Sequence, residues 1–171
     1  MEHAVVVARL VHILGGVFWV GAVLFVTFLL LPAVRDVGPD GGKVMGALVR
    51  RRLLEILPAV ALLTILSGLF LYDTLSGHFR GPWMHTPTGI AFGVGGILSI
   101  IALVLGVSLM RPATLQAGAL TAQAMGLPEG AERAARLAEA ERLRGKAGRW
   151  GTVVTWLLLV TAALMAVARY L

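Results

Sequence analysis

The longest uncharged stretch of the chain is the feature that most constrains its fold. No Asp, Glu, Lys or Arg occurs between Leu10 and Val34, a run rich in Leu, Val and Phe. At about 1.5 Å per residue, a helix of about 20 such residues crosses the ~30 Å hydrocarbon core of a bilayer. The sequence therefore predicts a membrane-spanning helix near the N-terminus. The run is too long for the apolar core of a signal peptide, so we expect this helix to be retained.

Composition extends this prediction to the whole chain. Of the 171 residues, 58% are hydrophobic and 14% are charged, and the mean hydropathy is +0.86. We expect an all-α integral membrane protein, because a helix satisfies its own backbone hydrogen bonds in lipid. The formal charge of +6 is assigned to the loops between helices, not to a nucleic-acid surface. The absence of cysteine excludes disulfides, thiolate metal sites, Fe–S clusters and covalently attached haem.

Four segments are long and apolar enough to be membrane spans, and together they predict a four-helix bundle that forms one domain over residues 1–171. The spans are expected at about residues 4–31, 53–72, 87–110 and 151–170. Pro32 is expected to end the first span, because proline cannot donate a helical hydrogen bond, and Pro58 is expected to kink the second.

Basic residues in the loops predict the orientation of the bundle. Arg and Lys are frequent in residues 33–52 and 111–149, whereas residues 73–86 contain only Arg80. By the positive-inside rule, the first and third loops lie in the cytoplasm and both termini lie outside, in a multi-pass protein of the inner membrane. Residues 111–149 are rich in helix formers and are expected to form a cytoplasmic helical hairpin that turns near Gly126. The alternative is an amphipathic helix on the inner leaflet.

One ionisable side chain, His12, lies inside the first span. Gly15, Gly16 and Trp19 follow it on the same helical face. Imidazole is a ligand for haem iron and for metal ions, and two glycines leave room for a flat cofactor. The alternative is a histidine that hydrogen-bonds to a neighbouring helix, with the glycines serving close helix packing. Arg9, one turn earlier, is a candidate partner for a haem propionate, or it extends to the lipid headgroups.

The other three histidines lie on the same predicted outer side of the membrane. His3 precedes the first span, His78 lies in the second loop and His85 precedes the third span. His85 is the candidate second ligand beside His12, although His12 lies about two helical turns deeper. Together with Met84, the four histidines are also candidate copper ligands.

These motifs resemble those of a group of four-helix membrane proteins. Val11-His12-Ile13 in a Gly/Trp-containing span, a basic first loop, and Trp83-Met84-His85 before span 3 are similar to HemJ-type protoporphyrinogen oxidases and CopD-type copper-resistance proteins. The likeness covers spans 1 to 3. It implies a b-type haem on His12 and places the W-x-H motif of the group on Trp83 and His85. Three features differ: Pro87 replaces a lysine of HemJ-like sequences, no further histidine follows in span 3, and the long third loop is foreign to the group.

Three functions are consistent with these residues. The first is a membrane redox protein that binds haem b and exchanges electrons with a quinone or a porphyrinogen. Its candidate ligands are His12 and His85, with Arg9, Gly15 and Gly16 beside the cofactor. The second is a copper-handling membrane protein. The third is an accessory subunit without a cofactor that packs, as a homo-oligomer or in a larger membrane complex, through its glycine faces. The chain has no motif of a hydrolase or of nucleotide-driven transport.

Overall fold

The structure is a computed structural model that describes residues 2–37 and 41–171. Within these two ranges the chain forms helices joined by short turns, and no strand occurs. Four helical segments are long and apolar enough to cross a membrane: Glu2–Asp36, Leu53–Ser76, Pro87–Met125 and Ala131–Tyr170. The predicted all-α class with four candidate membrane helices is therefore confirmed.

The first long helix consists of three consecutive segments. These are α1 (Glu2–Phe25), the π-helical η1 (Val26–Leu30) and α2 (Leu31–Asp36). A short helix, α3 (Gly41–Arg50), then leads into α4 (Leu53–Ser76). The 3₁₀ turn η3 (Pro82–His85) precedes α5 (Pro87–Leu105), which continues through the π-helical η4 (Gly106–Met110) into α6 (Arg111–Met125). The chain ends with α7 (Ala131–Val167) and η5 (Ala168–Tyr170).

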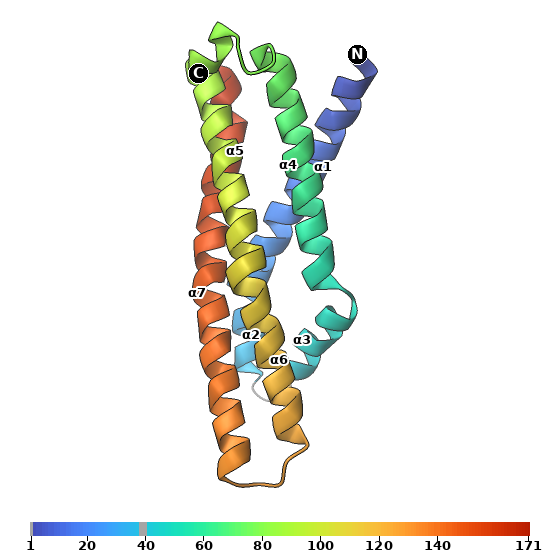
Figure 1. Ribbon diagram of the computed structural model, residues 1–171, viewed down its shortest axis with the longest axis vertical. Helices are drawn as coiled ribbons and strands as arrows, with labels where there is room; N and C mark the ends of the chain where they lie inside the picture. Colours follow the sequence, from blue (N-terminus) through green and yellow to red (C-terminus); the bar gives the residue numbers. More distant parts are fainter. Residues whose placement is uncertain (1, 38–40) are drawn as a thin grey trace.

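The helices pack mainly as three pairs. α6 packs against the first part of α7, α5 packs against α7, and α1 packs against α4, while α4 also contacts α5. Both α1 and α5 begin at the end of the molecule where the two chain termini lie, so these two helices run in the same direction (Figure 1). α2, α3 and α6 lie toward the opposite end, which we call the basic end because Arg35, Lys43 and Arg50 to Arg52 lie there.

The first long helix does not end at Pro32, contrary to the sequence prediction. In η1 the backbone N–H of Leu31 donates to the carbonyl of Val26, five residues earlier, which widens the turn before the proline. Pro32 then occupies the first turn of α2, where its missing N–H costs no helical bond. The same arrangement recurs where η4 precedes Pro112 in α6. α4 likewise continues through Pro58, which lies near its beginning.

The buried core is small, and most large apolar side chains point outward. The core cluster contains Trp19, Val23, Ala61, Ile65, Ala102, Val154 and Leu158. By contrast, Leu14 and Val17 on α1 are 66% and 69% exposed. Soluble proteins rarely expose contiguous apolar surface of this extent, whereas a bilayer accommodates it. The exposed helix faces therefore agree with a membrane environment.

Two continuous helices, α5–η4–α6 and α7–η5, are much longer than a membrane crossing needs, and their far halves form a helical hairpin of α6 and α7. Pro87–Met125 has 39 residues and Ala131–Tyr170 has 40, or about 60 Å each, twice the hydrocarbon core. The expected reversal near Gly126 falls between the two helices. Small buried residues line their contact, namely Ala113, Ala117 and Ala124 on α6 and Ala140 on α7. Arg136 and Arg144 of α7 donate hydrogen bonds of 2.6 Å to Gln123 and Thr121 of α6.

Candidate functional site

His12 lies at the contact between α1 and α4 and is half-buried. Its Nδ1 atom is 2.8 Å from the backbone carbonyl oxygen of Thr64. Because a carbonyl oxygen only accepts, Nδ1 carries a proton and donates it, and Nε2 is the ring nitrogen that this hydrogen bond does not use. His12 therefore joins two helices by a hydrogen bond, which was the second of the two interpretations drawn from the sequence.

The space next to the glycines near His12 is filled by protein side chains. Gly15 faces the hydroxyl of Thr64, and the Cγ2 of Thr64 lies 3.7 Å from the place of a Cβ on Gly16. On α4, a Cβ added to Gly68 would lie 2.7 Å from Cε1 of His12. These glycines allow α1 and α4 to approach each other closely. A porphyrin edge would have to displace Thr64 or separate the helices to enter between them.

The structure does not bring the other predicted haem-site residues to His12. His85 is exposed in η3, next to Trp83, whose ring centroid is 5.4 Å from that of Tyr72. Tyr72 lies eight residues beyond Thr64 on α4, or about 12 Å along the helix. Arg9 is exposed on α1. His12 and His85 therefore occupy different levels of the bundle.

The candidate copper ligands are also dispersed. His3 is exposed near the start of α1, and the exposed His78 lies 3.0 Å from a carboxylate oxygen of Asp73. Within residues 2–37 and 41–171, no group of three or more His, Asp or Glu side chains is arranged to hold a metal ion. No arrangement in the described chain thus favours a copper site.

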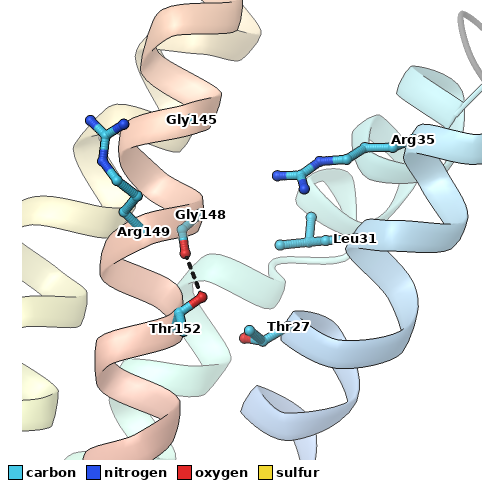
Figure 2. A pocket seen from close by; sticks show the side chains of 7 residues that line it. All are labelled: Thr27, Leu31, Arg35, Gly145, Gly148, Arg149 and Thr152. Carbon is cyan, nitrogen blue, oxygen red and sulfur yellow. Dashed lines mark hydrogen bonds between the residues drawn. The ribbon is translucent and has the colours of Figure 1, made fainter.

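A different part of the molecule contains a polar pocket, which we call the Arg35 pocket. It has a volume of about 240 Å³ and lies between the η1–α2 segment and α7. Its lining residues are Thr27, Leu31 and Arg35 on one side and Gly145, Gly148, Arg149 and Thr152 on the other (Figure 2).

The guanidinium of Arg35 extends from α2 across the pocket toward α7 (Figure 2). A Cβ on Gly148 would lie 3.2 Å from Nη2 of Arg35, so a glycine at this position leaves space for the guanidinium. Arg149 adds a second cation at the pocket rim, with its side chain turned away from Arg35 in Figure 2. Neither arginine forms an ion pair with a carboxylate of the described residues. The pocket therefore carries positive charge that no described acidic side chain neutralises.

Next to the Arg35 pocket, toward the middle of the bundle, both π-helical segments lie against α7. The hydroxyl oxygens of Thr27 in η1 and Thr155 in α7 are 3.0 Å apart. A Cβ on Gly151 would lie 3.9 Å from the Thr27 hydroxyl and 3.5 Å from the sulfur of Met110 in η4. Both π-helical segments thus meet α7 at Gly151, which directly precedes the pocket residue Thr152. π-Helical turns occur frequently at functional sites.

Sequence reasoning assigned Arg35 and Arg149 to basic loops and so missed this pocket. One signal was present: Gly145, Gly148 and Gly151 recur every three residues and share a face of a helix. This spacing is typical of a helix face that a neighbouring segment approaches closely, and the structure has such neighbours at Gly148 and Gly151, but the spacing does not identify the segment. That information depends on the packing of η1 and α2 against α7.

Together, the fold and its outward apolar faces define a multi-pass α-helical membrane protein. Comparisons of the chain with models of known protein families, with curated proteins and with solved structures found no match. Evidence about its function therefore comes from its own residues.

Proposed function

We propose that the protein is an accessory subunit that binds a partner protein through the outward face of α6. The observation that carries this proposal is the lack of charge on that face. Between Pro112 and Pro128 the chain has no charged residue, although Gln116, Ala119, Ala122 and Met125 are exposed. A helix that only faces water normally has a charged outer surface.

The neighbouring helix has such a charged surface. On the first half of α7, Glu132 pairs with Arg136 at 2.9 Å and Glu139 pairs with Arg142 at 2.6 Å. The two helices of the hairpin therefore differ in the surface that they present. The difference supports a solvated face on α7 and a protein-covered face on α6.

Small side chains make the outward face of α6 suitable for another helix. Gly118, Ala119 and Ala122 are all exposed there, and small residues let two helix backbones approach closely. The partner that fits this surface is a protein with a helix of uncharged, small or apolar residues. Because α5, η4 and α6 run without interruption, the partner would be held at a fixed distance from the bundle.

The same proposal places the hairpin in the cytoplasm and both termini outside, in the inner membrane. The basic end of the bundle supports this orientation, because Arg and Lys concentrate in cytoplasmic loops. Labelling with a membrane-impermeant maleimide tests it directly, since the natural chain contains no cysteine. We expect Arg80→Cys to react in intact cells and Ala135→Cys, on the solvated face of α7, to react only after the membrane is permeabilised. The reverse pattern would invert the orientation.

Crosslinking from single cysteines tests the accessory function. Ala119→Cys and Ala122→Cys lie on the outward face of α6, and Ala135→Cys and Ala138→Cys are matched controls at exposed positions of α7. A thiol-linked photo-crosslinker in native membranes should give one discrete heteromeric adduct from α6 and none from α7. An adduct of twice the chain mass would indicate a homo-oligomer instead. Equal adducts from both helices would contradict a specific docking face.

A b-haem redox protein is the second candidate, and one observation favours it. The hydrogen bond from Nδ1 of His12 to the Thr64 carbonyl leaves Nε2 as the ligating nitrogen, the arrangement in which histidines commonly bind a metal. The resemblance to HemJ- and CopD-type proteins agrees with it. Haem would supply one-electron transfer, with a quinone or a porphyrinogen as the exchange partner. Because Thr64 and His12 occupy the space beside Gly15 and Gly68, α1 and α4 must separate before haem could enter.

A pyridine haemochrome assay on the purified protein distinguishes the two candidates. Haem at about one per chain, lost in His12→Ala and retained in His85→Ala, would establish the redox function. A folded sample without a haem signal, together with the α6 adduct, would establish the accessory function.

A further inference from the structure

We infer that the Arg35 pocket binds the phosphate of an anionic phospholipid, whose acyl chains lie along Phe28 and Trp156. The ligand class follows from two properties that occur side by side on one surface. The pocket offers cationic and hydroxyl groups, and the adjoining surface toward the middle of the bundle is aromatic and exposed.

The polar part of the site matches a phosphate group. Arg35 offers a planar set of N–H donors that suits phosphate oxygens, and it has no carboxylate partner among residues 2–37 and 41–171. Thr27 and Thr152 also line the pocket, but the Thr152 hydroxyl donates to the Gly148 carbonyl at 3.1 Å and the Thr27 hydroxyl bonds to Thr155 at 3.0 Å, so the arginines are the donors to the phosphate. Arg149 lies at the rim, where rotation of its flexible side chain would bring a second cation to the bound phosphate.

The position of the pocket along the helices matches the headgroup region of a bilayer. Arg35 is the first charged residue after the uncharged run from Leu10 to Val34. On α7, Gly145, Gly148 and Arg149 lie just before the apolar second half of the helix. The pocket is therefore at the level where a membrane-spanning surface changes from apolar to charged, and basic pockets between membrane helices bind anionic headgroups at this level.

The surface next to the pocket matches an acyl chain. Phe28 follows Thr27 in η1, and its ring lies edge-on to that of Trp156, with centroids 6.5 Å apart. These rings are 45% and 57% exposed. Trp156 is one helical turn beyond Thr152 and about 16 Å beyond Gly145 along α7. A soluble phosphate would use the pocket alone, whereas a phospholipid would use the pocket and the aromatic surface together.

Glycine keeps the pocket open on the α7 side. Gly145 and Gly148 contribute no side chain, and a Cβ on Gly148 would already be 3.2 Å from the Arg35 guanidinium. A branched side chain at this position would fill the space that the phosphate needs. Gly148→Val therefore closes the site without removing a charge.

Native mass spectrometry and thermal unfolding of the detergent-purified chain test the inference. The probes are phosphatidylglycerol, phosphatidylcholine, glycerol 3-phosphate and inorganic phosphate. We expect saturable retention of about one phosphatidylglycerol per chain with an increase in Tm, and much weaker effects from the other three probes. Equal stabilisation by glycerol 3-phosphate or inorganic phosphate would show a soluble-anion site and overturn the lipid assignment. Equal retention of phosphatidylcholine would show that the negative charge of the lipid does not contribute to binding, and it would overturn the assignment to an anionic phospholipid.

Matched variants assign the effect to the pocket. Arg35→Gln should weaken phosphatidylglycerol binding about tenfold, the scale of one charge-assisted hydrogen bond. Arg51→Gln removes the same charge from an exposed position outside the pocket and should leave binding unchanged. Equal losses in the two variants would indicate only diffuse attraction to the basic end. Gly148→Val and Trp156→Ala should each weaken binding, and normal binding in both would overturn the proposed site.

Discussion

The backbone carbonyl of Thr64 on α4 accepts hydrogen bonds from the Nδ1 of His12 on α1 at 2.8 Å and from the hydroxyl of Ser67 on its own helix at 2.9 Å. The hydroxyl of Thr64 in turn donates to the backbone carbonyl oxygen of Val60 at 2.9 Å. In a bilayer, polar groups at this depth have no water to bond and must find partners in the protein. The contact between α1 and α4 therefore contains a local polar network that does not need a cofactor to be satisfied.

The first prediction concerns the contribution of His12 to this contact. His12→Ala should lower the free energy of unfolding by about 1–3 kcal/mol, because it removes an interhelical hydrogen bond and leaves a cavity. Unfolding of the purified protein in mixed detergent micelles measures this change. His85→Ala is the matched control, since His85 is exposed, and it should unfold like the natural chain. Equal stability of the two variants would contradict the role of His12 as an interhelical tie.

The second prediction concerns Gly68, which faces the His12 ring. A methyl group at this position would lie 2.7 Å from Cε1 of His12, closer than carbon atoms approach without a shift. Gly68→Ala should therefore destabilise the protein by about 1–3 kcal/mol, the usual cost of overpacking. In the His12→Ala background the same substitution should cost much less, because the ring is gone. Additive effects in this double-mutant cycle would show that the two residues are not in contact.

The fold was predictable from the sequence where lipid dictates it. In a bilayer, the backbone N–H and C=O groups of the uncharged run from Leu10 to Val34 find partners only within a helix. The same reasoning located the other three helices. The predicted end of the first helix was wrong, because the rule that a proline ends a helix assumes regular α-helical spacing before Pro32. The π turn of η1 relaxes that spacing, so the proline rule on its own does not locate the end of the helix.

The candidate site was less predictable, for a reason that His12 and Arg35 illustrate. The sequence placed His12 inside a span but left two interpretations open, because the partner of its imidazole is on another helix. Arg35 appeared to be an ordinary cytoplasmic arginine, because Gly148, which lies opposite it, is far away in the chain. Helical spacing identifies which residues share a face, whereas the neighbour of that face depends on tertiary packing.

The third prediction tests the contact of η1 with α7. The hydroxyl of Thr155 is fully buried and lies 3.0 Å from the hydroxyl of Thr27 and 2.8 Å from the carbonyl of Gly151. Thr155→Val keeps the volume but removes these bonds, and we expect a loss of about 1 kcal/mol in unfolding free energy. Thr155→Ser should lose less, because it keeps the hydroxyl. Thr74→Val, at an exposed position of α4 whose hydroxyl also donates to the carbonyl four residues earlier, is the control for the substitution itself.

The fourth prediction concerns the packing of the hairpin. Ala140 of α7 has no exposed surface and lies in the contact with α6, where Ala117 and Ala124 are also buried. The larger side chain of Ala140→Leu has no space in this contact, so the two helices must move apart at a cost of about 1–3 kcal/mol. We expect trypsin to cleave the arginine-rich first half of α7 faster in this variant, because local opening exposes its backbone. Ala138→Leu adds the same side chain at an exposed position and should be cleaved like the natural chain. Equal cleavage of the two variants would show that α6 and α7 do not depend on each other for their helical structure, and the hairpin would then be unsuited to hold a partner at a fixed distance from the membrane.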